Sequence, residues 1–165
     1  MRNHLDGYLD GYQRGLLELY RQNPHLEYPK DPSGRPLCRW CMGKVKPPKR
    51  TFCSPECVHQ YKLRSNWTYC KRFVAKRDKY ICQICRVDCR ALKKVLQSLP
   101  PKARLKEAER LGISQHRLQG KVLYDIDHIV PVVEGGGMTG PEGLRLLCIP
   151  CHKRETNKLR KRLKR

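Results

Sequence analysis

The chain has 165 residues, with 36 lysines and arginines against 15 aspartates and glutamates, and ten cysteines. This length allows one domain or two very small ones. No run of 18 apolar residues occurs, which excludes a membrane-spanning helix, and the acidic residues near the start argue against a secretory signal. Disulfides need an oxidising compartment, so paired cysteines here predict metal ligands rather than a disulfide framework.

The positive charge is confined to one part of the chain. Residues 1–33 hold four basic and five acidic side chains, whereas residues 34–165 hold 32 basic and ten acidic ones. Such a surplus favours a polyanionic partner, and DNA (double-stranded, branched or single-stranded) is the obvious one. A merely soluble basic surface is the alternative, and no amphipathic anchor supports contact with a membrane. We expect a protein of the cytoplasm or nucleoid, or of the nucleus in a eukaryotic host, that is not secreted.

Residues 1–33 predict an N-terminal helix followed by a linker. Apolar and aromatic residues recur at spacings of three and four over 4–21, which suits an amphipathic helix. Three glycines at every fourth position would let another helix approach closely, so this helix is a candidate for self-association or for binding a protein partner. An irregular leader is the alternative. Prolines and a glycine over 24–34 then predict a linker.

Residues 34–65 predict a short zinc finger of the treble-cysteine type. Two cysteine pairs, with members three and four positions apart, flank a short basic loop. Two such pairs satisfy one tetrahedral zinc ion. His59 is the main alternative for the fourth ligand, and disulfides are the alternative to a metal. The predicted ligands of this first structural zinc site are Cys38, Cys41, Cys53 and Cys57.

Residues 66–165 predict a second domain of the α+β class. Hydrophobic periodicity, β-branched runs and proline or glycine breakers give its elements. In chain order these are a basic helix over 64–79, short helices over 91–99 and 102–111, a strand over 122–130, a glycine-rich loop over 135–137, a strand over 144–147 and a terminal helix over 151–163.

This second domain carries a second set of paired cysteines. Between the two pairs lie 62 residues. The later pair follows a predicted strand and opens a predicted helix, a common arrangement at zinc sites. Cys70 and Cys89 are left over as free thiols. Four thiolates leave no open position on the metal, so both predicted zinc ions are structural and neither activates water. The predicted ligands of the second zinc are Cys82, Cys85, Cys148 and Cys151.

Three further side chains could carry chemistry. Asp127 and His128 lie on the first predicted strand, and His152 directly follows the last cysteine. If strand and helix pack together, Asp127 and His152 could share a hydrated divalent ion with His128 beside it as general base. Neighbouring residues of a regular strand point to opposite faces. The strand must therefore end or twist at this point, and Pro131 makes this plausible.

These residues resemble a known family, the HNH or ββα-metal endonucleases. The resemblance rests on Asp127-His128-Ile129-x-Pro131, on the glycine-rich loop, and on Leu144-x-x-Leu147-Cys148-x-x-Cys151-His152-Lys153. Arg77-Asp78, followed by Cys82-x-x-Cys85, resembles the region of the first cysteine pair in the zinc-bearing members of this family. Phe52-Cys53-Ser54-x-x-Cys57 and Arg64-Ser65-Asn66 resemble the region before the HNH domain of a eukaryotic annealing helicase. The resemblance implies a small zinc-stabilised ββα-metal nuclease core with a helical insertion.

The resemblance also implies roles for single residues. Asp127 and His152 would bind one catalytic Mg²⁺ or Mn²⁺, and His128 would deprotonate the attacking water. Hydrolysis would leave 5′-phosphate and 3′-hydroxyl ends. Two departures from the family pattern stand out: Gly143 occupies the position of the middle Asn of the family name, and Thr156 the position where some members have a further His.

The C-terminal tail predicts a DNA-binding helix. Eight of its last 13 residues are basic, and nothing in it resembles a base-reading code, so we expect low sequence specificity. The expected function is that of a metal-dependent DNA nickase. The alternatives are a catalytically weak zinc-finger nucleic-acid-binding module and an interaction protein that recruits a partner through 4–21. The candidate phosphate contacts are Lys153, Arg154, Lys158, Arg160, Lys161 and Arg162.

Overall fold

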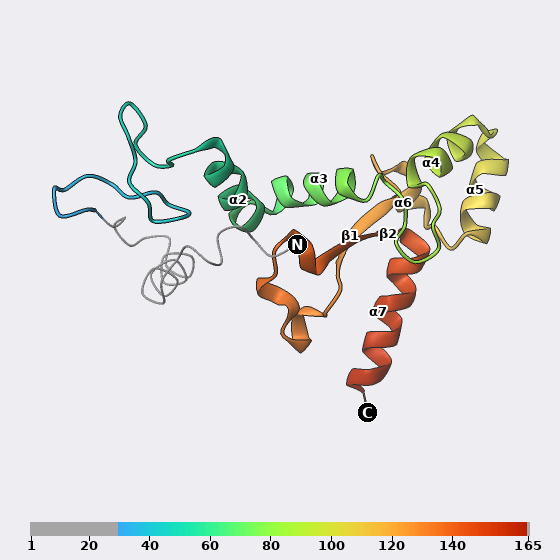
Figure 1. Ribbon diagram of the computed structural model, residues 1–165. Helices are drawn as coiled ribbons and strands as arrows, with labels where there is room; N and C mark the ends of the chain where they lie inside the picture. Colours follow the sequence, from blue (N-terminus) through green and yellow to red (C-terminus); the bar gives the residue numbers. More distant parts are fainter. Residues whose placement is uncertain (1–29, 165) are drawn as a thin grey trace. The chain divides into compact units, whose positions relative to one another are not determined.

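The computed structural model describes residues 30–164, and the chain divides into two compact units, Met1–Trp67 and Thr68–Arg165 (Figure 1). The predicted helix over 4–21 and most of the predicted linker lie outside the described residues. No described helix combines the length and apolarity that crossing a membrane requires. Each unit is described by itself below.

The described part of the first unit is built around its cysteines. Its core holds Cys38, Trp40, Met42, Val45 and Cys57, all buried. Helix α2 (Pro55–Ser65) was not predicted. It begins because Ser54 Oγ accepts a hydrogen bond from the Cys57 amide at 3.1 Å and because proline occupies the first helical position.

The second unit contains the predicted mixture of helices and a small sheet, so the α+β class is confirmed. Most predicted elements are present. Strand β1 is shorter than the predicted strand, and the terminal helix begins two residues before its predicted start. The five-residue helix α6 was not predicted. The elements are α3 (Trp67–Arg77), α4 (Cys89–Ser98), α5 (Pro101–Arg110), α6 (Gln115–Gln119), β1 (Tyr124–His128), the 3₁₀ turns η1 (Val132–Glu134), η2 (Gly136–Met138) and η3 (Pro141–Gly143), β2 (Leu144–Cys148) and α7 (Ile149–Leu163).

The two strands pair antiparallel, and their register decides which side chains share a face. Asp125 lies opposite Leu147, and Asp127 lies opposite Arg145. Successive residues of a strand point to opposite faces, so these four residues share the face that α7 covers. Ile126 and Leu144 point the other way and pack against Cys70 and Val74 of α3. The sheet is therefore covered by a helix on each face.

Arg77 and Asp78 fasten the end of α3 to strand β2. The Asp78 carboxylate, almost fully buried, accepts a hydrogen bond from the Leu146 amide at 2.8 Å. Arg77 bonds Asp78 Oδ1 at 2.8 Å and donates to the Leu144 carbonyl at 2.7 Å. Charged partners make these hydrogen bonds stronger than neutral ones. They fix β2, and with it the start of α7.

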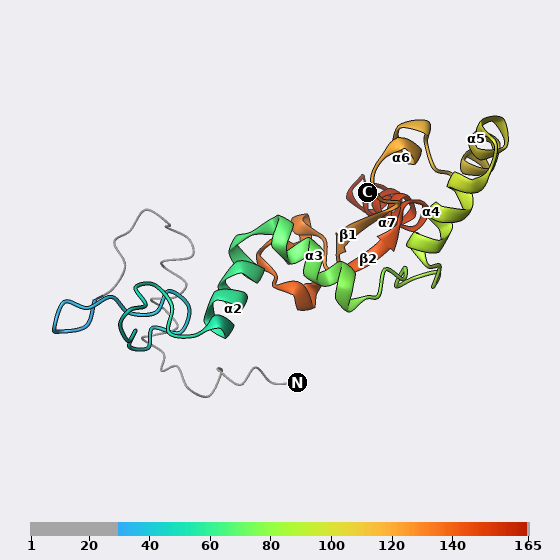
Figure 2. The same cartoon turned by 90° about the horizontal axis from the view of Figure 1, so that it is seen from above.

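Helices α4, α5 and α6 form an insertion that lies beside one end of the sheet (Figures 1 and 2). Asp88 caps α4 by accepting hydrogen bonds from the amides of Arg90 and Ala91. Pro100 and Pro101 separate α4 from α5. A buried cluster then joins the insertion to the residues that precede β1 and to the start of α7; its members are Leu96, Ala108, Ile113, Leu123 and Ile149.

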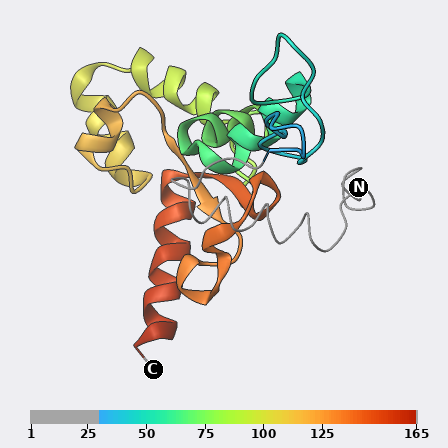
Figure 3. The same ribbon diagram turned by 90° about the vertical axis from the view of Figure 1, so that its left-hand side faces the viewer.

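Helix α7 leads away from the sheet, and the loop that connects the two strands lies beside it (Figures 1 and 3). An ion pair between Arg162 and Glu134 at 2.8 Å ties the far end of α7 to this loop. Gly135 takes a left-handed conformation with φ of +94° where η1 ends, a conformation that favours glycine. Of the predicted catalytic residues, Asp127 and His128 lie at the end of β1 where this loop begins, and His152 lies in the first turn of α7.

Candidate metal centres and catalytic site

The first predicted cysteine cluster assembles in the first unit. The four sulfur atoms lie within 4.8 Å of one another, a spacing suited to one metal ion. Cys53 Sγ lies 3.5 Å from Cys41 Sγ and 3.4 Å from Cys57 Sγ. Cys57, in the first turn of α2, completes the cluster, and His59 is not part of it.

The second predicted cluster assembles equally well, although its pairs are distant in sequence. Cys82 and Cys85 lie in the loop after α3, whereas Cys148 ends β2 and Cys151 lies in the first turn of α7. These four sulfur atoms also lie within 4.8 Å of one another. All ten cysteines belong to the described residues, and none forms a disulfide. Both clusters could therefore hold structural zinc.

Each cluster contains a thiol that favours the thiolate form, which is the form that binds metals. A hydrogen bond from Cys41 lowers the pKa of Cys38 to about 4. In the second cluster burial opposes ionisation, but backbone hydrogen bonds from Cys148, Cys85 and Ile84 prevail and lower the pKa of Cys82 to about 6. Burial raises the pKa of Cys89, which lies outside the cluster, to about 12.

Asp127 and His152 come together on the α7 face of the sheet. Asp127 lies on β1 and His152 in the first turn of α7, and Asp127 Oδ1 is 3.9 Å from His152 Nε2. Two ligands bound to one ion at about 2.1 Å each lie roughly 3–4 Å apart. A carboxylate oxygen and an imidazole nitrogen, both partly exposed, are thus spaced as two ligands of one divalent ion.

A second carboxylate contacts the same imidazole, and sequence reasoning missed it. Asp125 Oδ2 lies 3.2 Å from His152 Nδ1, and the hydrogen bond with Asp125 raises the pKa of His152. Burial opposes ionisation of Asp125, but hydrogen bonds from His152 and Arg117 prevail and lower its pKa. The spacing of Asp125 and Asp127 by two positions on a strand was the signal available in the sequence.

Each of these two carboxylates also forms an ion pair with an arginine. Arg117 of α6 bonds Asp125 Oδ1 at 2.7 Å. Arg145, opposite Asp127 in the sheet, bonds Asp127 Oδ2 at 2.9 Å and reaches Glu155 of α7 at 3.4 Å. Asp127 therefore keeps Oδ1 toward His152 while Oδ2 is occupied. Neither arginine could be assigned to the site from sequence, because their partners depend on register and on the position of the insertion.

His128 is the last residue of β1 and lies opposite Leu144. Alternation along the strand places its side chain on the face covered by α3, whereas Asp127 faces α7. The ladder continues for one more hydrogen bond, from the Ile129 amide to the Gly143 carbonyl at 2.9 Å, and the chain then bends. The strand thus ends near the residue where an end or a twist was expected.

Gly143 has a physical explanation in this chain. A Cβ atom at this position would overlap the side chain of Thr139, which reaches into the same space. Both residues line a cavity of about 370 Å³ in the loop between the strands, together with Val130, Glu134, Gly135 and Gly136. Thr139 thus fills the place where a side chain at residue 143 would begin.

Gly143→Asn should therefore destabilise the protein, by about 1–3 kcal/mol, because overpacking displaces neighbouring atoms. Thr139→Gly in the same chain should restore part of this loss, so that the double variant is more stable than the sum of the single variants predicts. Urea unfolding of the two single variants and the double variant measures this coupling. Strictly additive changes would show that the two side chains do not compete for one space.

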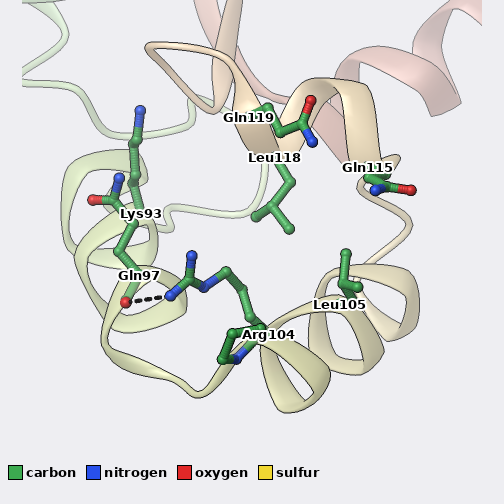
Figure 4. A pocket seen from close by; sticks show the side chains of 8 residues that line it. Lys93, Gln97, Arg104, Leu105, Gln115, Leu118 and Gln119 are labelled. Carbon is green, nitrogen blue, oxygen red and sulfur yellow. Dashed lines mark hydrogen bonds between the residues drawn. The ribbon is translucent and has the colours of Figure 1, made fainter.

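The pocket between α4, α5 and α6 is not a candidate active site (Figure 4). Its volume is about 320 Å³, and Lys93 and Arg104 are its cationic residues. Arg104 donates hydrogen bonds to the carbonyls of Gln97 and Leu99, and Lys93 donates to those of Gly120 and Lys121. The hydrogen bonds of these two side chains join α4 and α5 to neighbouring segments of the insertion, so both cations have a structural role.

The basic residues of α7 fall into two groups. Arg154 bonds Cys151 Sγ at 2.9 Å, Lys158 bonds Glu155 at 2.8 Å, and Arg162 bonds Glu134 at 2.8 Å. These three predicted phosphate contacts therefore have partners within the protein. The remaining predicted contacts are exposed, and spacings of seven and eight positions from the first of them place all three on one side of the helix; they are Lys153, Arg160 and Lys161.

Comparison with known proteins supports the HNH interpretation. Residues 117–158 match the family model described as HNH endonuclease. This segment holds the last three residues of α6, both strands and the first ten residues of α7. It includes Asp127, His128 and His152. The resemblance inferred from sequence is confirmed.

The chain is also similar to part of a larger protein. The DNA annealing helicase and endonuclease ZRANB3 of Mus musculus is 31% identical over 145 residues, which covers 76% of this chain but 14% of that protein. The Homo sapiens protein is 28% identical over 145 residues, covering 76% and 13%. The crystal structure of the human ZRANB3 HNH domain matches with 28% identity and a TM-score of 0.47, covering 61% of this chain and 97% of that one. The chain thus spans about one-seventh of the length of the two ZRANB3 proteins.

Proposed function

Because residues 117–158 carry an HNH endonuclease domain, we propose that the protein is a metal-dependent endonuclease that cuts DNA one strand at a time. The observation that carries this proposal is the pairing of Asp127 Oδ1 with His152 Nε2 at 3.9 Å on a partly exposed face. One such site acts on one strand, so a single protein molecule nicks a duplex.

The donor atoms fit a Mg²⁺ or Mn²⁺ ion. Both ions bind carboxylate oxygens, and Mn²⁺ also binds imidazole nitrogen. With two protein ligands, either ion keeps coordination positions open for water and phosphate oxygens. Asp127 and His152 would hold the ion, and Arg145 would keep the Asp127 carboxylate in place. The bound ion supplies positive charge that stabilises the charge developing on the phosphate and on the leaving oxygen.

His128 is the proposed general base. Its imidazole takes a proton from a water molecule whose oxygen attacks the phosphorus atom, and the bond between phosphorus and the 3′ oxygen breaks. The 3′ oxygen takes a proton from solvent, which leaves a 3′-hydroxyl and a 5′-phosphate end. His128 is the last residue of β1, so its side chain would have to reach this water past the end of the strand.

The two cysteine clusters are proposed to hold one structural Zn²⁺ each. The second ion would join the loop after α3 to the junction of β2 and α7, where His152 follows Cys151 directly. Its binding energy is then also the energy that holds His152 in position. The domains are proposed as 34–65 for the first zinc finger and 66–165 for the nuclease.

DNA contact is proposed for the exposed side of α7. Lys153, Arg160 and Lys161 lie there and are exposed. They can neutralise phosphates without reading bases, which gives affinity with low sequence specificity and a steep dependence on salt. We propose that the protein acts in the compartment that contains the DNA, which is the nucleoid or, in a eukaryotic host, the nucleus.

Nicking of a supercoiled plasmid tests the proposed function. The protein should convert it to the open circle with Mg²⁺ or Mn²⁺ and not with EDTA. Asp127→Ala should remove this activity, because one of two protein ligands is lost. Glu107→Ala, which removes an exposed carboxylate paired with Arg110 on α5, serves as the matched control and should cut as the original chain does. Equal cutting by Asp127→Ala would contradict the assignment.

A catalytically weak nucleic-acid-binding module is the second candidate. Gly143 in the Asn position and the bond of Arg145 to Asp127 Oδ2 favour it. The two functions differ in the same assay: the module would shift the plasmid on a gel at low salt without nicking it. A role of residues 4–21 in self-association predicts that the full chain is an oligomer by light scattering and that a chain without 1–33 has lost this oligomer.

A further inference from the structure

We propose that Asp125 is a positioning residue that fixes the ring orientation and the tautomer of His152, and that Arg117 of α6 holds Asp125 for this purpose. The proposal deepens the proposed function and rests on it where metal binding is concerned. It concerns two residues outside the predicted Asp127, His128 and His152 set, and it gives the helical insertion a part in the site.

The two contacts of the His152 ring differ in length. The distance from Nδ1 to Asp125 Oδ2 is 3.2 Å, which is a hydrogen-bonding distance, whereas Nε2 is 3.9 Å from Asp127 Oδ1, which is too long for one. The shorter contact therefore orients the ring, and the longer one leaves space beside Nε2. Both carboxylates reach the ring because they are two positions apart on β1.

The chemistry of the shorter contact determines the tautomer. An ionised carboxylate only accepts hydrogen bonds, so Nδ1 must carry the proton that it donates to Asp125. In the neutral ring Nε2 then has a free lone pair, and Nε2 is the nitrogen that lies 3.9 Å from Asp127 Oδ1. A histidine that binds a metal through one nitrogen commonly donates its other N–H to a carboxylate in this way.

Asp125 is itself held in place by the insertion. Arg117 Nη2 bonds Asp125 Oδ1 at 2.7 Å, while Oδ2 faces His152. Both side chains are about one-third exposed, 36% for Arg117 and 31% for Asp125. Arg145 holds Asp127 in the corresponding manner at 2.9 Å. Each carboxylate thus has one oxygen bonded to an arginine and the other directed at the imidazole.

Asp125→Asn tests the proposal, because the amide keeps the size of the side chain but can donate a hydrogen bond to Nδ1. In the metal-free site, with zinc retained, long-range ¹H–¹⁵N spectra at pH 8 should show His152 protonated on Nδ1. Asp125→Asn should shift the ring toward the Nε2–H form. The His152 signals are identified by their absence in His152→Gln. Mn²⁺ affinity, from the free ion in EPR spectra, should fall about 10–100-fold.

Glu107→Gln provides the matched control, since it removes the charge of another carboxylate bonded to an arginine, at 2.6 Å from Arg110, on α5. It should change neither the tautomer nor the Mn²⁺ affinity. Arg117→Gln should weaken Mn²⁺ binding less than Asp125→Asn does. An unchanged His152 tautomer in Asp125→Asn overturns the positioning role, even if the original chain nicks plasmid. A tautomer shift in a protein that never nicks supports the positioning role and rejects the proposed function instead.

Discussion

His128→Ala is expected to lower the rate of plasmid nicking by about 10²–10⁴-fold, the usual contribution of a general base. Affinity for DNA should stay unchanged, because the contacts proposed for DNA lie on α7. Mn²⁺ affinity should stay unchanged as well, because Asp127 and His152 are intact. The measurement is the rate of open-circle formation under single-turnover conditions, with binding followed separately by fluorescence anisotropy in EDTA.

His116→Ala is the matched control for this variant, since His116 is an exposed histidine of α6. It should nick at the rate of the original chain. The comparison is informative because register places His128 and Asp127 on opposite faces of β1. The His128 side chain must therefore reach the attacking water past the end of β1, because it does not share a face of the sheet with Asp127. If both histidine variants cut equally fast, another group accepts the proton, and the role given to His128 is wrong.

Local patterns were sufficient to predict the strand and the helix that carry the candidate site residues. The apolar run over 122–130 predicted a strand, and β1 is present within it. The pattern Cys148-x-x-Cys151-His152 predicted the start of a helix, and α7 begins there, two residues earlier than predicted. The helices that escaped prediction are α2, which begins inside a cysteine motif, and α6, which has five residues and little apolar periodicity. Short helices of this kind depend on caps and packing more than on sequence periodicity.

The pairing of side chains around the site could not be predicted from local patterns. Asp127 was proposed as a ligand, but its bond to Arg145 depends on the register of the two strands, which sequence alone does not give. The bond of Arg117 to Asp125 depends on how the insertion packs through Leu123 and Ile149. Gly143 looked like a defect of the motif, and the position of Thr139 explains it only in three dimensions.

Cys148→Ser is expected to unfold the proposed catalytic site and not merely to weaken it. Structural zinc contributes about 10–16 kcal/mol of apparent binding energy in small domains, whereas a whole domain is stable by about 5–15 kcal/mol. Cys148 lies at the junction of β2 and α7, four residues before His152. The variant should bind one zinc ion in place of two, lose the cooperative thermal transition of the second unit and lose nicking.

Cys38→Ser and Cys89→Ser separate this effect from a general need for thiols. Cys38 belongs to the first cluster, so its variant should also lose one zinc ion but should keep the folded second unit and its Mn²⁺ affinity. Cys89 is buried beside the second cluster without being part of it, so its variant should keep both zinc ions. Zinc is counted by elemental analysis, and folding is followed by near-ultraviolet circular dichroism. A Cys148→Ser protein that keeps two zinc ions and nicks normally would contradict this prediction. It would show that the Cys148 thiolate is not needed to hold His152 in place, because its loss would have left both the metal ion and the imidazole in position.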